Sequence, residues 1–146
     1  MGDMPRVTIY TDGACEPNPG HGGWAALLQF GKYERELCGS EKHTTNNRME
    51  LTAAVSALQA LQEPCQVTLY TDSEYLRRGI TEWLPDWRRR GWKRKSGQLA
   101  NIDLWQALEA IMSKHEITWH WVRGHAGNQL NQRVDSLARK AMRKST

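Results

Sequence analysis

The chain has 146 residues, a length that fits one domain with an ordinary hydrophobic core. Hydrophobic residues make up 39% and charged residues 25%, a composition that excludes a disordered chain. The net charge of +4 is mildly basic, and alone it only weakly favours a polyanionic partner. We interpret residues 1–146 as a single domain, and no unpaired apolar stripe demands a dimer, so we expect a monomer.

Cysteine usage and hydropathy indicate where the protein works. Cys15, Cys38 and Cys65 are odd in number and form no CxxC pair, so neither a disulfide framework nor a zinc site is indicated. A reducing compartment is the simplest interpretation. No apolar run approaches 18 residues, and the start of the chain lacks a basic segment followed by an apolar one. We therefore expect a cytoplasmic protein with no membrane segment.

Hydrophobic periodicity and turn residues predict alternating strands and helices. In chain order they are strands at 7–13, 22–30 and 33–38, a helix at about 47–62, a strand at 67–73, helical segments near 74–80 and 82–90, a helix at about 102–114, a strand at 117–122 and a helix at about 129–143. Asn46 or Asn47 can cap the start of the first helix. Strands that alternate with helices predict an α/β fold with a mixed sheet.

Two strand segments repeat one another: 7–13 reads VTIYTDG and 67–73 reads VTLYTDS. If they are parallel neighbours in register, Asp12 and Asp72 would lie about 4.8 Å apart at backbone level. Both would then stand at the carboxyl ends of strands, where open α/β sheets bind ligands. Glu50 and Asp135 each border the apolar stripe of a predicted helix, where an acid needs a partner.

Four converging carboxylates would form a hard-oxygen site suited to Mg²⁺ or Mn²⁺. Four acids carry −4 and two divalent ions carry +4, and ions about 3.5–4 Å apart can activate a water and stabilise the leaving oxygen of a phosphodiester. Plainer explanations exist for each acid. Asp12 could be a turn residue, Asp72 could cap a helix, Glu50 could pair with an arginine, and Asp135 could be solvated. The pattern alone leaves both interpretations open.

Six short motifs follow one another along the chain: TDGAC (11–15), NPGHGG (18–23), TTNNRMEL (44–51), TDSEY (71–75), GHAG (124–127) and NQRVD (131–135). With them the chain, from about residue 6 to residue 142, resembles type 1 ribonuclease H, especially its bacterial form. The resemblance implies a ribonuclease H-like fold, a five-stranded mixed sheet flanked by helices. It also implies an endoribonuclease that cuts the RNA strand of RNA–DNA hybrids and leaves 5′-phosphate and 3′-hydroxyl ends.

The resemblance implies a role for each acid. Asp12, Glu50, Asp72 and Asp135 would be the catalytic carboxylates and would hold two Mg²⁺ ions, or Mn²⁺, when substrate is bound. His125, between glycines, would assist proton transfer or product departure. Taken alone, such a histidine suits either a surface position or a proton shuttle near neutral pH.

Residues 83–95 interleave tryptophans with basic side chains that can bind phosphates by charge. Trp83 and Trp87 are four residues apart on a predicted helix, so spacing alone would also allow at least one of them in the core, and the run at 88–90 could be a solvated face. The resemblance implies that this segment binds the DNA strand through Trp83, Arg88, Arg89 and Arg90. It implies a phosphate pocket formed by Asn18, Thr45 and Asn101. It also implies that Cys15, Asn46 and Asn47 contact the hybrid near the cut.

Three departures from the resemblance stand out: Gln132 replaces a frequent Glu, Glu74 replaces a frequent Gln, and residues 97–100 lack a lysine common in bacterial relatives. Three rival interpretations of the chain exist. A non-catalytic hybrid-binding module should have lost a carboxylate. Another nuclease of the superfamily, such as a junction resolvase or integrase, is the second rival, and the basic segment and the TTNNRME motif favour ribonuclease H over it. The last rival is a structural domain whose motifs arose by chance.

Overall fold

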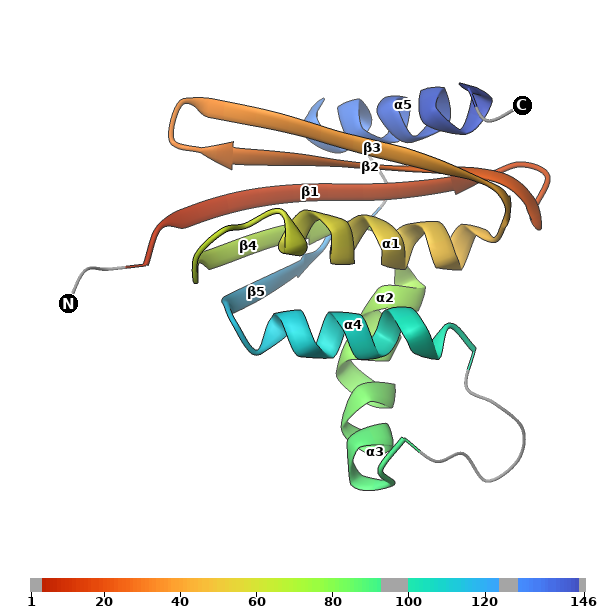
Figure 1. Cartoon of the computed structure of the whole chain (residues 1–146). Coiled ribbons are helices and arrows are strands. Elements are labelled where there is room, and N and C mark those ends of the chain that lie inside the picture. Colours follow the sequence, from red (N-terminus) through yellow and green to blue (C-terminus); the bar gives the residue numbers. More distant parts are fainter. Residues whose placement is uncertain (1–3, 93–99, 124–128, 145–146) are drawn as a thin grey trace.

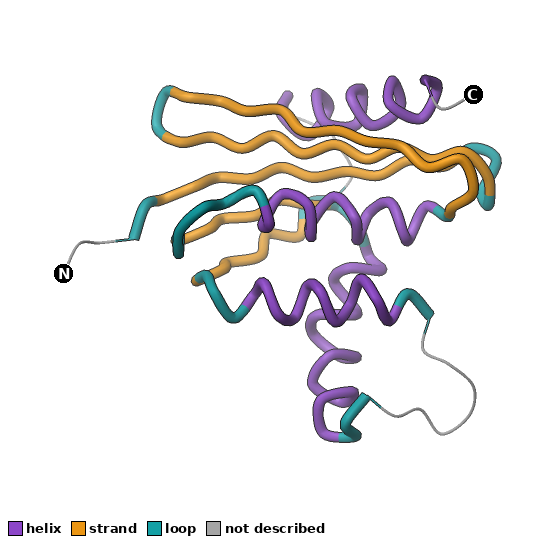
Figure 2. Tube along the Cα trace, viewed as in Figure 1, coloured by secondary structure: helices purple, strands orange, loops and turns teal. Residues whose placement is uncertain are grey.

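The computed structural model describes residues 4–92, 100–123 and 129–144. The elements in chain order are β1 (Arg6–Cys15), β2 (Gly20–Phe30), β3 (Tyr33–Thr44), α1 (Asn46–Gln59), β4 (Gln66–Thr71), α2 (Glu74–Arg78), the π-helical turn η1 (Gly79–Trp83), α3 (Leu84–Arg89), α4 (Ile102–Met112), β5 (Glu116–Trp121) and α5 (Gln129–Lys144). Figure 2 shows how helices and strands alternate along this path. No helix in these ranges is long and apolar enough to cross a bilayer.

The strands form one five-stranded sheet in the order β3-β2-β1-β4-β5. The pairs β1/β2 and β2/β3 are antiparallel, whereas β1/β4 and β4/β5 are parallel. Helices α1 and α4 lie on one side of the sheet and α5 lies on the other (Figure 1). The predicted fold class, a mixed sheet flanked by helices, is confirmed.

The two repeated segments pair with each other. Val7 lies opposite Val67, and the register continues in step to Tyr10 opposite Tyr70, so each residue meets its own counterpart. The two tyrosine rings stack, with centroids 4.8 Å apart and planes 10° from parallel. The expected parallel, in-register pairing is thus confirmed, and it brings the Thr-Asp ends of both segments to the same edge of the sheet.

The main core fills the space between the sheet and α1 and α4. Ile9, Leu69, Leu58 and Trp105 are fully buried there. Each such side chain contributes roughly 1.5–3 kcal/mol when it leaves water. A smaller cluster beneath α5 includes Val134. The two apolar layers clamp β1 and β4 in the middle of the sheet, which makes their carboxyl ends a rigid platform.

Two sequence-based details were wrong. The cap of α1 is Thr45, not Asn46 or Asn47: its Oγ1 accepts the backbone N–H of Arg48 at 3.1 Å, and its extended backbone suits that position. The strand expected at 33–38 continues to Thr44, because β2 goes on pairing with it as far as Gly20. Pairing with a long partner outweighs the weak strand preference of residues 39–44.

The helical run α2–η1–α3 projects away from the sheet as a protrusion (Figure 1). Its joint with the body is Gly79, where an added Cβ would stand 1.9 Å from Cη2 of Trp105. Trp105 is itself fully buried and cannot retreat. Only a residue without a side chain lets the protrusion leave the core at this point.

We therefore expect Gly79→Ala to destabilise the fold by about 3 kcal/mol, because overpacking a rigid core forces backbone shifts. Urea unfolding followed by tryptophan fluorescence measures the loss. Gly31→Ala is the comparison, because its Cβ would meet nothing within 4 Å and only the left-handed backbone at φ 59 is strained. That strain costs about 1 kcal/mol. Equal losses in the two variants would contradict the role of Trp105.

Candidate active site

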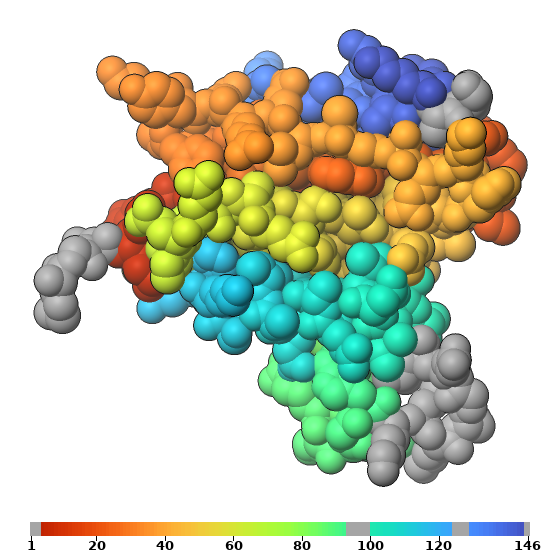
Figure 3. Space-filling model, in the orientation of Figure 1, coloured from red at the N-terminus to blue at the C-terminus, as the bar shows by residue number. Residues whose placement is uncertain are grey.

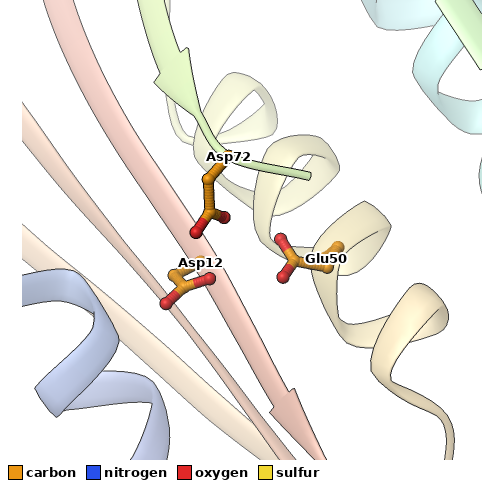
Figure 4. Close-up of side chains that lie close together, drawn as sticks. All are labelled: Asp12, Glu50 and Asp72. Atoms are coloured by element: carbon orange, nitrogen blue, oxygen red, sulfur yellow. The ribbon is translucent and has the colours of Figure 1, made fainter. Parts of the chain in front are cut away.

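Three carboxylates from three elements converge at the edge of the sheet. Asp12 stands on β1, Asp72 directly follows β4, and Glu50 lies in the first half of α1. One oxygen from each lies within 4.8 Å of the other two. Figure 4 shows the three side chains pointing toward one another. The sequence predicted this meeting, and the structure brings these three together.

The close approach of α1 to β1 depends on Gly13. A Cβ at this position would stand 2.5 Å from the backbone nitrogen of Glu50 and 2.6 Å from the carbonyl carbon of Met49. Any larger residue after Asp12 would push the helix away from the strand. Gly13 therefore sets the distance between the Asp12 and Glu50 carboxylates, and the simple turn explanation for the Asp-Gly pair is wrong, because both residues lie within β1.

Burial and crowding make the charged forms of these acids unfavourable. Asp12 is 3% exposed and Glu50 is 6% exposed. Desolvation, followed by the charge of Asp72, raises the pKa of Asp12 to about 8. Desolvation and then the charge of Asp12 raise the pKa of Glu50 well above its ordinary value. A backbone hydrogen bond from Gly13 acts in the opposite direction on both pKa values but does not prevail.

The donor set fits a hard divalent cation. Oε2 of Glu50 is buried with no hydrogen-bond partner among the described residues, an arrangement that normally costs stability. Three oxygen ligands without thiols suit Mg²⁺ or Mn²⁺ rather than softer metals. A cation at this point would satisfy the orphaned oxygen and offset the repulsion between the acids.

Asp135, the fourth predicted carboxylate, lies beside the site rather than in the central group. It accepts a hydrogen bond from the protonated carboxyl of Asp12, and this bond raises the pKa of Asp12. Its own oxygens accept from Nε of Arg139 at 3.2 and 3.3 Å, one turn along α5. The position is adjacent to the other three acids, and Arg139 already offsets part of its charge. His125 lies outside the described residues, as do the basic residues 93–95.

A cavity of about 470 Å³ opens beside the start of α1. It is lined by Pro19, Gly20, His43, Thr44, Thr45, Arg48 and Asn101. Thr45 and Asn101 were predicted as phosphate ligands, whereas Asn18 is outside the lining and accepts the backbone N–H of Asn46 at 3.1 Å. Oγ1 of Thr44 is buried without a partner among the described residues, so this oxygen does not itself face the cavity.

Arg48 ties this cavity to α4, and sequence reasoning missed it. Its Nη2 lies 2.7 Å from Oδ2 of Asp103, and its Nη1 donates to Oδ1 of Asn101 at 3.3 Å. This pairing lowers the pKa of Asp103. Arg48 stands within the TTNNRMEL motif, which was a signal of importance, but nothing in the sequence indicated its partner 55 residues away.

The protrusion carries the predicted DNA-strand contacts. Trp83 is half-buried against Tyr75 and Trp105, so it is partly a core residue. Arg88, Arg89 and Arg90 are exposed on the surface, where Arg88 pairs with Glu109 and the other two pair with Asp86. The two pairs with Asp86 are exposed and weak, so Arg89 and Arg90 can exchange Asp86 for phosphates, whereas Glu109 is partly buried. The protrusion forms its own lobe in the space-filling view (Figure 3).

Comparison with known proteins identifies the family. The sequence profile of the family RNase H matches residues 4–143. The chain belongs to the ribonuclease H family. A ribonuclease H of Bradyrhizobium diazoefficiens is 56% identical over 146 residues, covering 99% of this chain and 95% of the relative. One of Halorhodospira halophila is 58% identical over 137 residues, covering 93% and 92%.

Solved ribonuclease H structures share the fold. LC9-RNase H1, described as a type 1 RNase H with the type 2 active-site motif, superposes with a TM-score of 0.89 at 34% identity, covering 100% of this chain and 76% of that one. LC11-RNase H1 in complex with an RNA/DNA hybrid superposes at 0.72 and 22% identity, covering 95% and 98%, which supports the fold alone. This ribonuclease H is a hydrolase of the nuclease class.

The remaining contacts place other predicted residues of this ribonuclease H. Cys15 donates its thiol to the carbonyl of Pro17 at 3.3 Å, at the end of β1. Asn47 lies exposed in the first turn of α1. Glu74, the departure noted in the TDSEY motif, accepts from Nη1 of Arg77 at 3.4 Å, so its extra negative charge has a neighbouring cation.

Proposed function

We propose that this ribonuclease H cuts the RNA strand of RNA–DNA hybrids with divalent metal ions, Mg²⁺ or Mn²⁺, and leaves 5′-phosphate and 3′-hydroxyl ends. The observation that carries the proposal is the group of Asp12, Glu50 and Asp72, with oxygens within 4.8 Å of one another. Membership of the family supports the substrate, and the relative crystallised with an RNA/DNA hybrid agrees with it.

Each residue of the active site would have its own role in cleavage. Asp12, Glu50 and Asp72 would hold the ions, with Asp135 adjacent. Bound divalent ions supply an activated water and stabilise the leaving oxygen. Gly13 keeps the helix and strand close enough for the acids to act together. The role of His125 in proton transfer or product departure stays a prediction from the family resemblance.

The cavity beside α1 and the protrusion would hold the hybrid. Thr45 and Asn101 present short polar groups that suit a single phosphate, with Asn18 holding the start of α1 behind them. Contacts to the sugar-phosphate backbone carry no sequence information, so cleavage should depend little on base sequence. The RNA strand would be distinguished by its 2′-hydroxyls, with Cys15, Asn46 and Asn47 as candidates for contacts near the cut.

The decisive experiment compares four end-labelled substrates with Mg²⁺: a hybrid, single-stranded RNA, duplex RNA and duplex DNA. We expect products from the RNA strand of the hybrid alone. Treatment with a phosphatase should change the mobility of the 3′ fragment, because that fragment begins with a 5′-phosphate. Equal cutting of single-stranded RNA, or no cutting of the hybrid, would refute the proposal.

Replacing Arg88, Arg89 and Arg90 by Ala should weaken hybrid binding and flatten the slope of log binding constant against log salt by at most about 0.9 per lost phosphate contact. Fluorescence anisotropy between low and moderate salt measures this slope without metal. The matched control replaces Lys140, Arg143 and Lys144, three basic residues at the far end of α5. If both triple variants change the slope equally, the arginines of the protrusion contribute no more to hybrid binding than other surface cations do.

A further inference from the structure

We propose that Tyr75 is a positioning residue for the substrate: its hydroxyl orients the side-chain amide of Asn101 so that an N–H faces the cavity where a phosphate would bind. The inference rests on the proposed function and deepens it. It concerns how the cavity beside α1 prefers an anion, since the cation that borders it, Arg48, is already paired with Asp103.

The Tyr75 hydroxyl joins two side chains from α4 and the residue before it. It accepts from Nδ2 of Asn101 at 3.0 Å and from Nε1 of Trp105 at 3.0 Å. Trp105 is fully buried, so its N–H is a fixed donor. The Tyr75 ring also packs against Trp83 and Trp105, with centroid distances of 5.3 and 5.4 Å. These contacts hold the hydroxyl oxygen in place as an acceptor.

The orientation of the Asn101 amide follows from these neighbours. Its oxygen accepts from Nη1 of Arg48 at 3.3 Å while its nitrogen donates to Tyr75. If the amide turned over, its NH₂ group would face the Arg48 donors. An amide nitrogen carries two hydrogens, and only one is used by Tyr75. Because Asn101 lines the cavity, the second hydrogen is available to an oxygen of a bound phosphate.

Asn101 also gives up a common role of asparagine. It is the residue that precedes α4, where an Asn side chain usually accepts a backbone N–H of the first turn, yet it makes no such bond here. Its backbone is left-handed, at φ 58, a conformation that Asn tolerates better than most residues. The side chain is directed to Tyr75 and Arg48 instead of to its own helix, which points to a use outside helix stability.

The test is Tyr75→Phe, which removes one oxygen and keeps the ring contacts. In steady-state cleavage of a hybrid with Mg²⁺, we expect KM to rise about three- to tenfold, the effect of one lost hydrogen bond. We expect kcat to stay within about twofold, because a contact made equally in ground and transition states changes KM alone. Tyr33→Phe is the matched control, since Tyr33 is 72% exposed and lies at the end of β3 opposite to Thr44, which lines the cavity.

Two Asn101 variants test whether the Tyr75 hydroxyl acts on substrate binding through the Asn101 amide. In an Asn101→Ala background, Tyr75→Phe should cause no further rise in KM. Asn101→Asp, which keeps the shape but turns an oxygen toward the phosphate, should raise KM more than Asn101→Ala does. The proposal is overturned if Tyr75→Phe leaves KM unchanged or lowers only kcat. It is overturned as well if Tyr75→Phe raises KM by the same factor in the Asn101→Ala background as in the wild type. It is also overturned if Asn101→Asp is no worse than Asn101→Ala.

Metal-free hybrid binding is measured for the same proteins, together with their thermal midpoints. The dissociation constants should follow the order expected for KM. If the wild type binds the hybrid but does not cut it, the proposed function fails, while the binding series still decides the role of Tyr75. If all variants melt near the wild-type midpoint yet bind alike, the positioning role is wrong.

Discussion

Asp12→Asn is expected to lower the rate of hybrid cleavage on the order of a thousandfold or more, as losing a main electrostatic contributor commonly does. Asp12 is 3% exposed, and one of its oxygens lies within 4.8 Å of an oxygen of Glu50 and of an oxygen of Asp72, where a shared ion would bind all three. An amide of the same shape cannot supply the negative charge that a divalent ion needs. Single-turnover cleavage of a labelled hybrid at saturating Mg²⁺ measures the loss.

The same variant should remain folded. Asn is isosteric with Asp, and removing one of several crowded acids relieves repulsion rather than creating a cavity. Circular dichroism and thermal melting without metal check this expectation. Glu63→Gln, an exposed acid in the loop before β4, is the control for loss of a single negative charge and should cleave normally. Retained cleavage by Asp12→Asn would place the metal site elsewhere.

Stability without divalent ions is expected to rise as the pH falls from about 8.5 to about 6. The pKa of Asp12 is raised from 3.8 to about 8, so the folded protein keeps a proton that the unfolded chain releases. A group raised in this way stabilises the fold fully below its unfolded pKa, and the contribution is lost as the pH rises through the folded pKa. Glu50 acts in the same direction. Each such carboxyl contributes up to about 1.4 kcal/mol per pH unit in this window.

Divalent metal should reverse this trend, because it binds the deprotonated acids and competes with protons. At a hundredfold excess over its dissociation constant, Mg²⁺ would add about 2.7 kcal/mol. The increase in the thermal midpoint should be larger at pH 8 than at pH 6. Differential scanning calorimetry with EDTA or Mg²⁺ at both pH values provides the measurement.

Asp12→Asn is the control for this stability series as well, since it should reduce both the pH dependence and the gain from metal. Asp103 and Glu34 have lowered pKa values, so they titrate below the window and do not obscure it. If the thermal midpoint without metal does not change between pH 6 and pH 8.5, the pKa values of the buried acids are not raised in the folded protein.

The sequence by itself determined the order of strands and helices, the parallel pairing of the repeated segments and the meeting of Asp12 with Asp72. These follow from local patterns: period-two strands, period-3.6 helices and a repeat whose two copies pair residue for residue. The position of Glu50 was also predictable, because Glu50 borders an apolar helical stripe. When that stripe packs against the sheet, the Glu50 carboxylate lies close to the sheet as well. Sequence patterns were sufficient wherever the residues within one short segment specify its structure.

Tertiary structure alone decided which distant polar groups became partners. Arg48 pairs with Asp103, 55 residues away, and the Tyr75 hydroxyl accepts hydrogen bonds from both Asn101 and Trp105. A polar side chain can be satisfied by many partners of similar energy, so its choice depends on which surfaces the packed core brings within about 3 Å. Apolar periodicity specifies the core, and the core then specifies these pairs.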